Sequence, residues 1–258
     1  MSNKAQMYSG YHAVEAILRR RPHDALELFV QDSRAERGEE RLDLLMQEAA
    51  RLGVKAQHAK RDVLEKHAGP QHQGVVVRAR PRPVGDDNSL QDLVSCALSP
   101  ERVSSRVPLL LLLDGVTDPH NLGACLRSAD AAGVDAVIVP RRNACGLTPV
   151  VCRTAVGAAE SVPYFEVSNL VRTMESLKQR GVWLAGTALA EDSQPLFGFH
   201  SDAPLAVVMG AEGEGMRQST RQACDYLLEI PMAGEVQSLN VSVATAVVLF
   251  HLAKGRRF

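Results

Sequence analysis

The sequence predicts an α/β protein with two domains, the larger of which contains a mostly parallel sheet. Three observations lead to this fold class. Apolar runs such as 109–113 and 205–209 are typical of strands that are buried on both faces. In the second half of the chain, such runs alternate regularly with helix-like segments. A proline-containing stretch interrupts the periodicity between the halves, and 258 residues are enough to form two cores.

The first 80 residues are expected to form the smaller domain. Helix and strand patterns alternate along this part of the chain, and Gly74 opens a β-branched run that is typical of a strand. The expected helices lie near 12–20, 39–52 and 61–67, and the expected strands near 26–30, 54–57 and 74–79. Residues 1–80 therefore make a small, complete α/β unit.

Residues 81–105 are expected to be a linker. The segment 80–88 reads Arg-Pro-Arg-Pro-Val-Gly-Asp-Asp-Asn, and its prolines, glycine and polar residues match neither a helix nor a strand period.

The larger domain is then expected over residues 106–258. The predicted strands lie at 107–113, 135–139, 162–166, 182–186, 204–209 and 226–230. The predicted helices lie at 121–132, 148–159, 169–180, 215–222 and 239–254. This order favours a parallel sheet with helices on both faces.

The composition is that of an ordinary globular protein, with 45% hydrophobic and 23% charged residues. We expect a cytoplasmic location, because the sequence shows neither an apolar run of membrane-spanning length nor an apolar signal core near Met1. A net charge of −1 does not indicate nucleic-acid binding, although arginines cluster at 19–21, 78–82 and 141–142. A solvated surface is the simpler explanation for each cluster.

The five cysteines are odd in number and include no Cys-x-x-Cys pair, so they predict neither a disulfide framework nor a zinc site. Cys125 lies beside a candidate site loop, but no base is recognisable near it. We expect all five thiols to be structural, and no metal is expected.

Two polar, glycine-containing loops follow strongly apolar runs, at 114–123 and 210–215, and a third polar segment at 238–240 opens the last helix. In open α/β sheets, ligands bind beyond the carboxyl ends of the strands. Three candidate loops in one domain therefore suggest an enzyme.

The loop at 210–215 has the glycine spacing of a dinucleotide site, but its chemistry argues against that function. Glu212 and Glu214 would repel a pyrophosphate, and the loop lies late in the domain. The glycines instead predict close backbone approach to a ligand that is not strongly anionic.

Asn121 and Arg127 belong to the helix that follows the first loop, where Pro119 suits the first turn. Arg127 lies in an otherwise small and apolar sequence, so its guanidinium needs an anion or a carbonyl partner. A weak ion pair with Asp130 is the simpler alternative. Ser238 and Asn240 suit a helix cap, which accounts for one of the two.

Together these segments resemble the three motifs of the SpoU (TrmH-type) branch of the SPOUT RNA methyltransferases. The residues that carry the resemblance are 114–130, 208–216 and 230–244, in the family's order and spacing. In the first half, Tyr8-Ser-Gly-Tyr-His-Ala-Val and His72-Gln-Gly-Val-Val resemble the L30e-like RNA substrate-binding domain of several members.

This resemblance implies a C-terminal SPOUT domain whose last segment threads a deep trefoil knot, an exception to the rule that chains do not thread loops. It implies that S-adenosyl-L-methionine binds in the knot and that two copies form a homodimer through that region. Gly210, Ile230 and Leu239 would contact the cofactor by motif position, with Thr187 at a strand end as a further candidate.

The resemblance also assigns a catalytic role to Arg127, with Asn121, Glu212, Ser238 and Asn240 as the other motif residues. Arginine is a difficult general base because its pKa exceeds 12, so a proton acceptor and a fixed cation both remain open. Physical chemistry favours the cation.

The implied activity is methylation of the ribose 2′-oxygen of a guanosine in the peptidyl-transferase P loop of 23S ribosomal RNA. A transfer RNA ribose 2′-O-methyltransferase and a non-catalytic RNA-binding factor for ribosome assembly are the alternatives. The intact motif residues disfavour the second alternative, and the L30e-like half disfavours the first.

Overall fold

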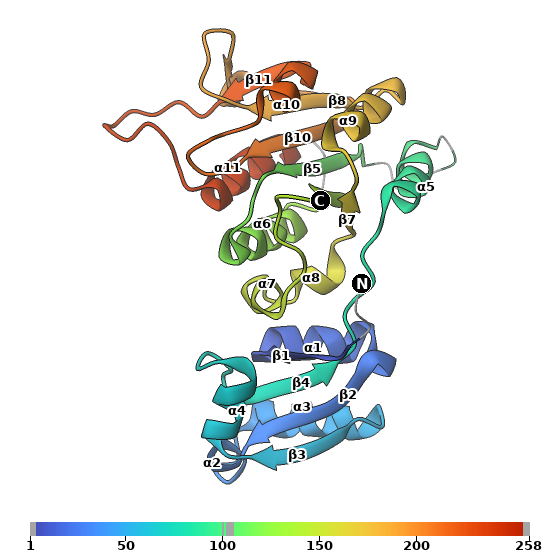
Figure 1. Cartoon of the computed structure of the whole chain (residues 1–258), viewed down its shortest axis with the longest axis vertical. Coiled ribbons are helices and arrows are strands. Elements are labelled where there is room, and N and C mark those ends of the chain that lie inside the picture. Colours follow the sequence, from blue (N-terminus) through green and yellow to red (C-terminus); the bar gives the residue numbers. More distant parts are fainter. Residues whose placement is uncertain (1–3, 100, 102–105, 255–258) are drawn as a thin grey trace. The chain divides into compact units, whose positions relative to one another are not determined.

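The computed structural model describes residues 4–99, 101 and 106–254, shown in Figure 1. The chain forms two compact units. Unit 1 comprises residues 1–83 together with 147–161, and unit 2 comprises 84–146 together with 162–258.

Unit 1 contains a four-stranded sheet in the order β1-β4-β2-β3, in which only the β2–β3 pair is parallel. The strands are β1 (Gln6–Ser9), β2 (Ala25–Gln31), β3 (Lys55–Ala59) and β4 (Val75–Ala79). The helices are α1 (Tyr11–Arg20), a 3-10 turn (Pro22–Asp24), α2 (Asp32–Ala35), α3 (Glu40–Arg51) and α4 (Arg61–Ala68). Each element predicted for this part of the chain is present, and β1, α2 and the 3-10 turn are additional.

The segment 147–161 packs within unit 1 as two short helices, α7 (Pro149–Thr154) and α8 (Ala158–Ser161). The prediction of a single helix over 148–159 was wrong, because Val156 and Gly157 have φ angles of 54° and 92° and stop the helix between them. A Cβ on Gly157 would lie 3.3 Å from the Cβ of Ala16, so α8 packs closely on α1.

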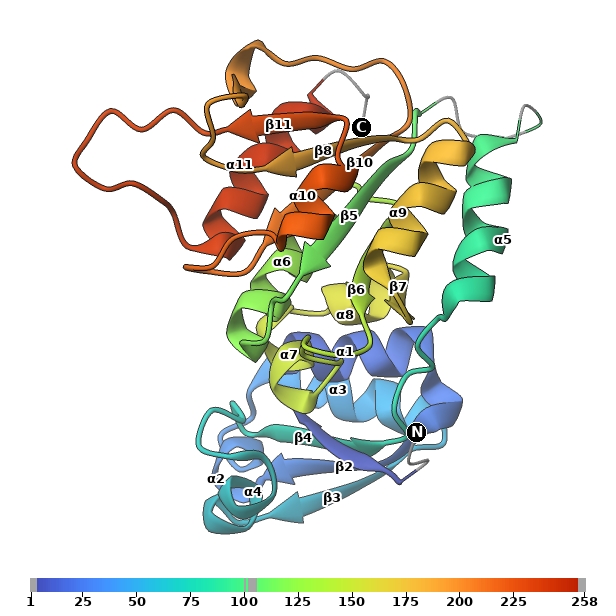
Figure 2. The same ribbon diagram turned by 45° about the horizontal axis from the view of Figure 1, so that its top comes forward.

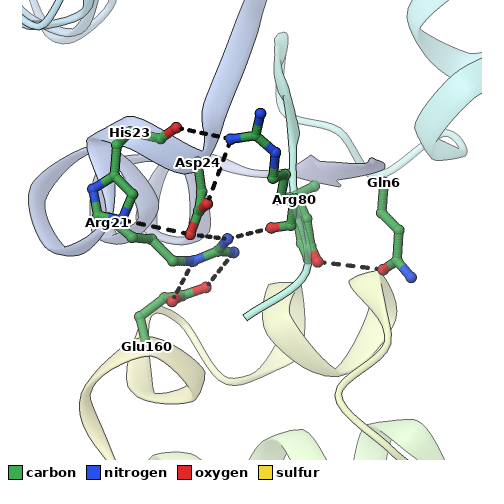
Figure 3. Close-up of polar contacts among 7 residues, drawn as sticks. Gln6, Arg21, His23, Asp24, Arg80 and Glu160 are labelled. Carbon is green, nitrogen blue, oxygen red and sulfur yellow. Dashed lines mark hydrogen bonds and ion pairs between the residues drawn. The ribbon is translucent and has the colours of Figure 1, made fainter. Parts of the chain in front are cut away.

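A buried ion pair also holds this segment (Figure 3). Arg21 Nε and Nη2 donate to the two carboxylate oxygens of Glu160 at 2.8 and 3.0 Å. The same guanidinium donates to the Arg80 carbonyl oxygen and lies 3.7 Å from Asp24 Oδ2. Both side chains of the pair are at most 7% exposed, so the contact is shielded from water.

Unit 2 is built on a seven-stranded sheet in the order β7-β6-β5-β10-β8-β11-β9, and every strand pair in it is parallel. The strands are β5 (Leu109–Asp114), β6 (Ala136–Pro140), β7 (Tyr164–Val167), β8 (Trp183–Thr187), β9 (Gln194–Pro195), β10 (Leu205–Gly210) and β11 (Tyr226–Glu229). A 3-10 turn (Leu196–Gly198) follows β9. The predicted α/β class with a mostly parallel sheet is confirmed.

The helices of unit 2 are α5 (Asp87–Leu98), α6 (Pro119–Ala131), α9 (Leu170–Gln179), α10 (Gln218–Ala223) and α11 (Val241–Ala253). Figure 2 shows α5 and α9 side by side, and buried residues of both helices pack with the central strands. Helices α6 and α11 pack against each other. Helix α5 occupies part of the range expected as a linker. Within the described residues, no helix is long and apolar enough to cross a membrane.

Candidate active site

Three polar side chains from separate segments meet in unit 2 at the carboxyl edge of the parallel sheet. Asn121 comes from α6, Glu212 from the loop after β10, and Asn240 from the residue before α11. Asn121 Nδ2 donates to Glu212 Oε2 at 3.1 Å, and Asn240 Nδ2 donates to the same oxygen at 3.0 Å. Asn240 Nδ2 also lies 3.0 Å from Asn121 Oδ1. The structure thus joins three of the five predicted catalytic residues in one network.

The N-terminal ends of helices α6 and α11 hold Asn121 and Asn240 in place. The Asp118 carboxylate caps α6 by accepting from the His120 N–H at 3.1 Å, and Pro119 begins the helix, so Asn121 lies in its first turn. Asn240 is itself the cap of α11, because its Oδ1 accepts from the Ser242 N–H at 2.9 Å. Its amide nitrogen is therefore directed at Glu212 by the same geometry that starts the helix.

A pocket of about 390 Å³ lies next to this network. The four predicted cofactor residues all line it, namely Thr187, Gly210, Ile230 and Leu239. Glu212 and Ser238 line it as well. Sequence reasoning missed other lining residues, among them Leu228 and Met232, because apolar side chains in loops and at strand ends carry no distinctive signal.

The loop after β10 forms one wall of the pocket through close backbone contact. Ala211 and Gly215 exchange two backbone hydrogen bonds, at 3.0 and 2.9 Å. A Cβ on Gly210 would lie 2.1 Å from the carbonyl carbon of Gly215 and from the nitrogen of Met216. Only glycine fits at position 210, because the backbone of residues 215–216 in the same loop occupies the place of a side chain.

Asp114, which sequence reasoning did not single out, connects the first loop with this wall. Its carboxylate is 1% exposed, and Oδ2 accepts from the Arg217 N–H at 2.9 Å. Oδ1 lies 3.4 Å from the Arg217 guanidinium. A charged residue that ends an apolar strand was the available signal, since a buried carboxylate requires partners of this kind.

Arg127 lies on α6, exposed, and six residues beyond Asn121, which corresponds to about 9 Å along a helix. Its guanidinium makes no hydrogen bond or ion pair with any part of the chain that the structure describes, so the alternative of a pair with Asp130 finds no support. Arg127 does not line the pocket. The structure therefore leaves this cation available to a ligand.

The two buried cysteines, Cys125 and Cys152, do not offer a nucleophile. Burial raises the pKa of the Cys125 thiol to about 11 and that of Cys152 to about 12. Both thiols stay protonated near neutral pH, since the thiolate is the reactive form. All five cysteines are free, and among the described residues no group of His, Cys, Asp or Glu side chains could hold a metal ion.

Comparison with family models defines the class of protein. Residues 108–250 match the model described as the SpoU rRNA Methylase family. Residues 9–84 match a model described as RNA 2′-O ribose methyltransferase substrate binding. The chain therefore belongs to the SpoU rRNA methylase family.

Relatives that match over nearly their full length give a more specific comparison than the family models do. The 23S rRNA (guanosine-2′-O-)-methyltransferase RlmB of Shewanella oneidensis is 47% identical over 98% of this chain and 99% of its own length. The protein of the same name from Escherichia coli is 47% identical over 98% of this chain and 99% of its own. A solved structure described as an RNA 2′-O ribose methyltransferase has a TM-score of 0.75 and 26% identity, and the match covers 99% of this chain and 90% of that one.

Proposed function

We propose that this chain methylates the ribose 2′-oxygen of a guanosine in 23S ribosomal RNA, in the peptidyl-transferase P loop, with S-adenosyl-L-methionine as the methyl donor. The observation that carries the proposal is the identity of 47% to relatives named for this activity, over nearly the whole length of both chains. The similarity includes the substrate-binding half as well as the methylase half. A ribosomal RNA substrate would also put the protein in the cytoplasm.

The chemistry of the pocket suits this cofactor. The lining is largely apolar side chains and backbone, with the carboxylates of Glu212, Glu214 and Glu229 and a single arginine, Arg221. Arg221 is paired with Asp192 at 2.9 Å. S-adenosyl-L-methionine carries a sulfonium cation and no phosphate. The pocket carboxylates would therefore attract the positive charge of the sulfonium and would repel no phosphate. Gly210, Ile230, Leu239 and Thr187 would contact it.

When bound, the cofactor supplies a methyl group on a good leaving group, so the protein has to orient and activate the ribose hydroxyl. The 2′-oxygen forms the new bond to carbon as the carbon–sulfur bond breaks, and the hydroxyl proton is lost to solvent. Arg127 would stabilise the negative charge that develops on this oxygen. Asn121, Glu212 and Asn240, joined by hydrogen bonds, would orient the target nucleotide together with Ser238.

The proposal includes the architecture that the family resemblance implies. The first domain, residues 1–80, would bind the RNA substrate, and residues 81–105 would link it to the second domain. The second domain, residues 106–258, would be the methyltransferase domain, with a knotted last segment. Two copies would pair through the knot region as a homodimer. The composition of α11 supports this pairing, because this nearly all-apolar helix leaves Val243 and Phe250 49% and 48% exposed.

Gly210→Ala is expected to weaken binding of S-adenosyl-L-methionine at least tenfold, because the added Cβ would collide with the backbone of residues 215–216. Titration calorimetry measures the affinity. Gly234→Ala is the matched control in the loop after β11, since a Cβ there meets nothing within 4 Å. Equal affinities of the two variants would show that the loop after β10 does not form the cofactor site.

The activity itself is tested by incubating the protein with labelled S-adenosyl-L-methionine and unmodified 23S ribosomal RNA, followed by primer extension to locate the methylated nucleotide. Label in a guanosine of the P loop is the expected result. Transfer to transfer RNA alone would identify the transfer RNA enzyme instead. RNA binding without any transfer would point to an assembly factor.

A further inference from the structure

A polar hollow lies on unit 1, separate from the pocket in unit 2. It is bordered by the end of β2, helix α2, the start of α4 and the loop before β4, and it encloses about 520 Å³. Three arginines line it, Arg34, Arg37 and Arg61. The other lining residues that the structure describes are uncharged or histidine, and no carboxylate is among them. The charged side chains that line the hollow are therefore all positive, although two of the arginines also pair with carboxylates outside the lining.

One wall of the hollow is fixed before any ligand binds. Arg34 donates to the Gln73 carbonyl oxygen and lies 3.4 Å from Glu39. Its stem covers Gly74 so closely that a Cβ there would lie 2.5 Å from Arg34 Cδ. Gln73 has a φ of 56°, and its Oε1 accepts from the Tyr11 N–H at 3.1 Å. Such constraints keep Arg34 oriented and reduce the entropy lost on binding.

The two other arginines are available to a ligand. The Arg61 side chain is 69% exposed, and its pair with Glu65 at 2.7 Å joins neighbouring turns of one exposed helix, where such pairs contribute little. For the Arg37 side chain, the described residues provide no hydrogen bond or ion pair. An anionic ligand could therefore recruit both cations at little cost.

His72 also lines the hollow. It is 3% exposed, and its Nδ1 accepts from the Gly74 N–H at 2.9 Å, so the proton of the neutral ring lies on Nε2. Burial lowers the pKa of this histidine, which favours the neutral form. Nε2 has no hydrogen-bond partner among the described residues.

We propose that this hollow binds the sugar–phosphate backbone of the substrate RNA. The inference rests on the proposed function, which takes RNA as the substrate, and it names the surface of unit 1 that holds it. The planar guanidinium groups match phosphate oxygens in charge and geometry. Three of them around one hollow suit a chain of successive phosphates better than a single small anion. The match of residues 9–84 to a substrate-binding model is consistent with an RNA site on this unit.

The test compares two double variants of the full-length protein that remove the same charge from the same unit. The variant Arg37→Gln/Arg61→Gln removes the two available guanidinium groups from the lining of the hollow and leaves Arg34 unchanged. Arg51→Gln/Lys55→Gln is the control, since both residues are exposed and neither lines the hollow. The ligand is a transcript of the peptidyl-transferase region of 23S ribosomal RNA, and its dissociation constant is measured over a series of salt concentrations.

The hollow variant is expected to bind this transcript at least tenfold more weakly at low salt. The slope of log affinity against log salt should fall by about one for each phosphate that the protein no longer neutralises, hence by about two. The control should remain within about twofold of the unaltered protein. Both variants should keep cofactor affinity and the midpoint of thermal unfolding.

Equal RNA affinity and salt slope in the two variants would overturn the proposal, while methylation by the unaltered protein would leave the proposed function intact. If the hollow variant lost affinity for inorganic phosphate or free nucleotides without any change in RNA binding, the proposal would be overturned in favour of a small-anion site. Failure of the unaltered protein to bind or methylate the RNA would overturn the proposed function and the hollow together.

Discussion

Replacement of Arg127 by alanine is expected to lower the rate of methyl transfer by a factor of roughly 10² to 10³, the range for loss of one group that stabilises a developing oxyanion. The affinity for S-adenosyl-L-methionine should stay nearly unchanged, because Arg127 is not among the residues that line the pocket. Single-turnover transfer of labelled methyl groups measures the rate, and calorimetry measures the affinity.

The environment of Arg127 is the reason for expecting that its replacement affects catalysis and not stability. The side chain is exposed on α6, and no group in the described part of the chain neutralises its charge. Its loss should therefore cost little stability, which separates catalysis from folding in this variant.

Two further substitutions sharpen the assignment. Arg172→Ala removes an exposed arginine from α9 in the same unit and should leave the rate unchanged. Substantial activity in Arg127→Lys would support a simple cation over a role that needs the guanidinium group. A parallel fall in cofactor affinity in Arg127→Ala would contradict the role at the ribose.

Glu160→Ala is expected to destabilise unit 1 by about 3–5 kcal/mol, the usual cost of leaving one charge of a buried pair without its partner. In Figure 3 the Arg21 guanidinium lies between Glu160, Asp24 and the Arg80 carbonyl oxygen. Asp24 is 3.7 Å away and only partly replaces the lost carboxylate, because Glu160 accepts two hydrogen bonds. Urea unfolding followed by circular dichroism measures the change.

Glu15→Ala is the matched control, because Glu15 pairs with Arg41 at 2.9 Å on the surface of the same unit. With side chains 47% and 40% exposed, this pair should contribute no more than about 1 kcal/mol. If the two variants lose similar stability, the pair between Arg21 and Glu160 does not hold the segment 147–161 in place. Arg21→Met/Glu160→Leu should recover much of the loss by removing both charges.

Sequence periodicity was most reliable for long elements with a strong apolar pattern. The buried strands β5 and β10 and the helices α6, α9 and α11 lie within a few residues of their predicted bounds. Helix α5 was not predicted, because the prolines and glycine before it favour a linker over residues 81–105. Its capping box was readable in the sequence: the Asp86 carboxylate accepts from the Ser89 N–H at 3.0 Å, while Ser89 Oγ accepts from the Asp86 N–H at 2.8 Å.

The helix break at Val156 was not predictable in the same way. A β-branched residue rarely adopts a positive φ, so neither its type nor its position indicates the break. Packing of α8 on α1 and the ion pair of Glu160 with Arg21 select this conformation, and both contacts are distant in sequence.

In the candidate site, too, features set by neighbouring residues were predictable from the sequence, whereas contacts between residues far apart in the sequence were not. The capping role of Asn240 follows from its place before an apolar helix. Its hydrogen bonds to Asn121 and Glu212 join residues that are 119 and 28 positions apart, and no local pattern encodes them. The resemblance to the methyltransferase family named these residues, and the structure supplied the contacts between them.

The place of segment 147–161 in unit 1 has a consequence for how the protein can be divided by genetic truncation. The chain leaves unit 2 after Gly146, contributes α7 and α8 to the other unit, and returns at Val162. A fragment that begins after Pro83 would keep those two helices but lose β1 and α1, against which they pack. The two helices would then lose the packing of α7 on β1 and of α8 on α1. A single cut in the gene therefore cannot separate the two units without disrupting this packing.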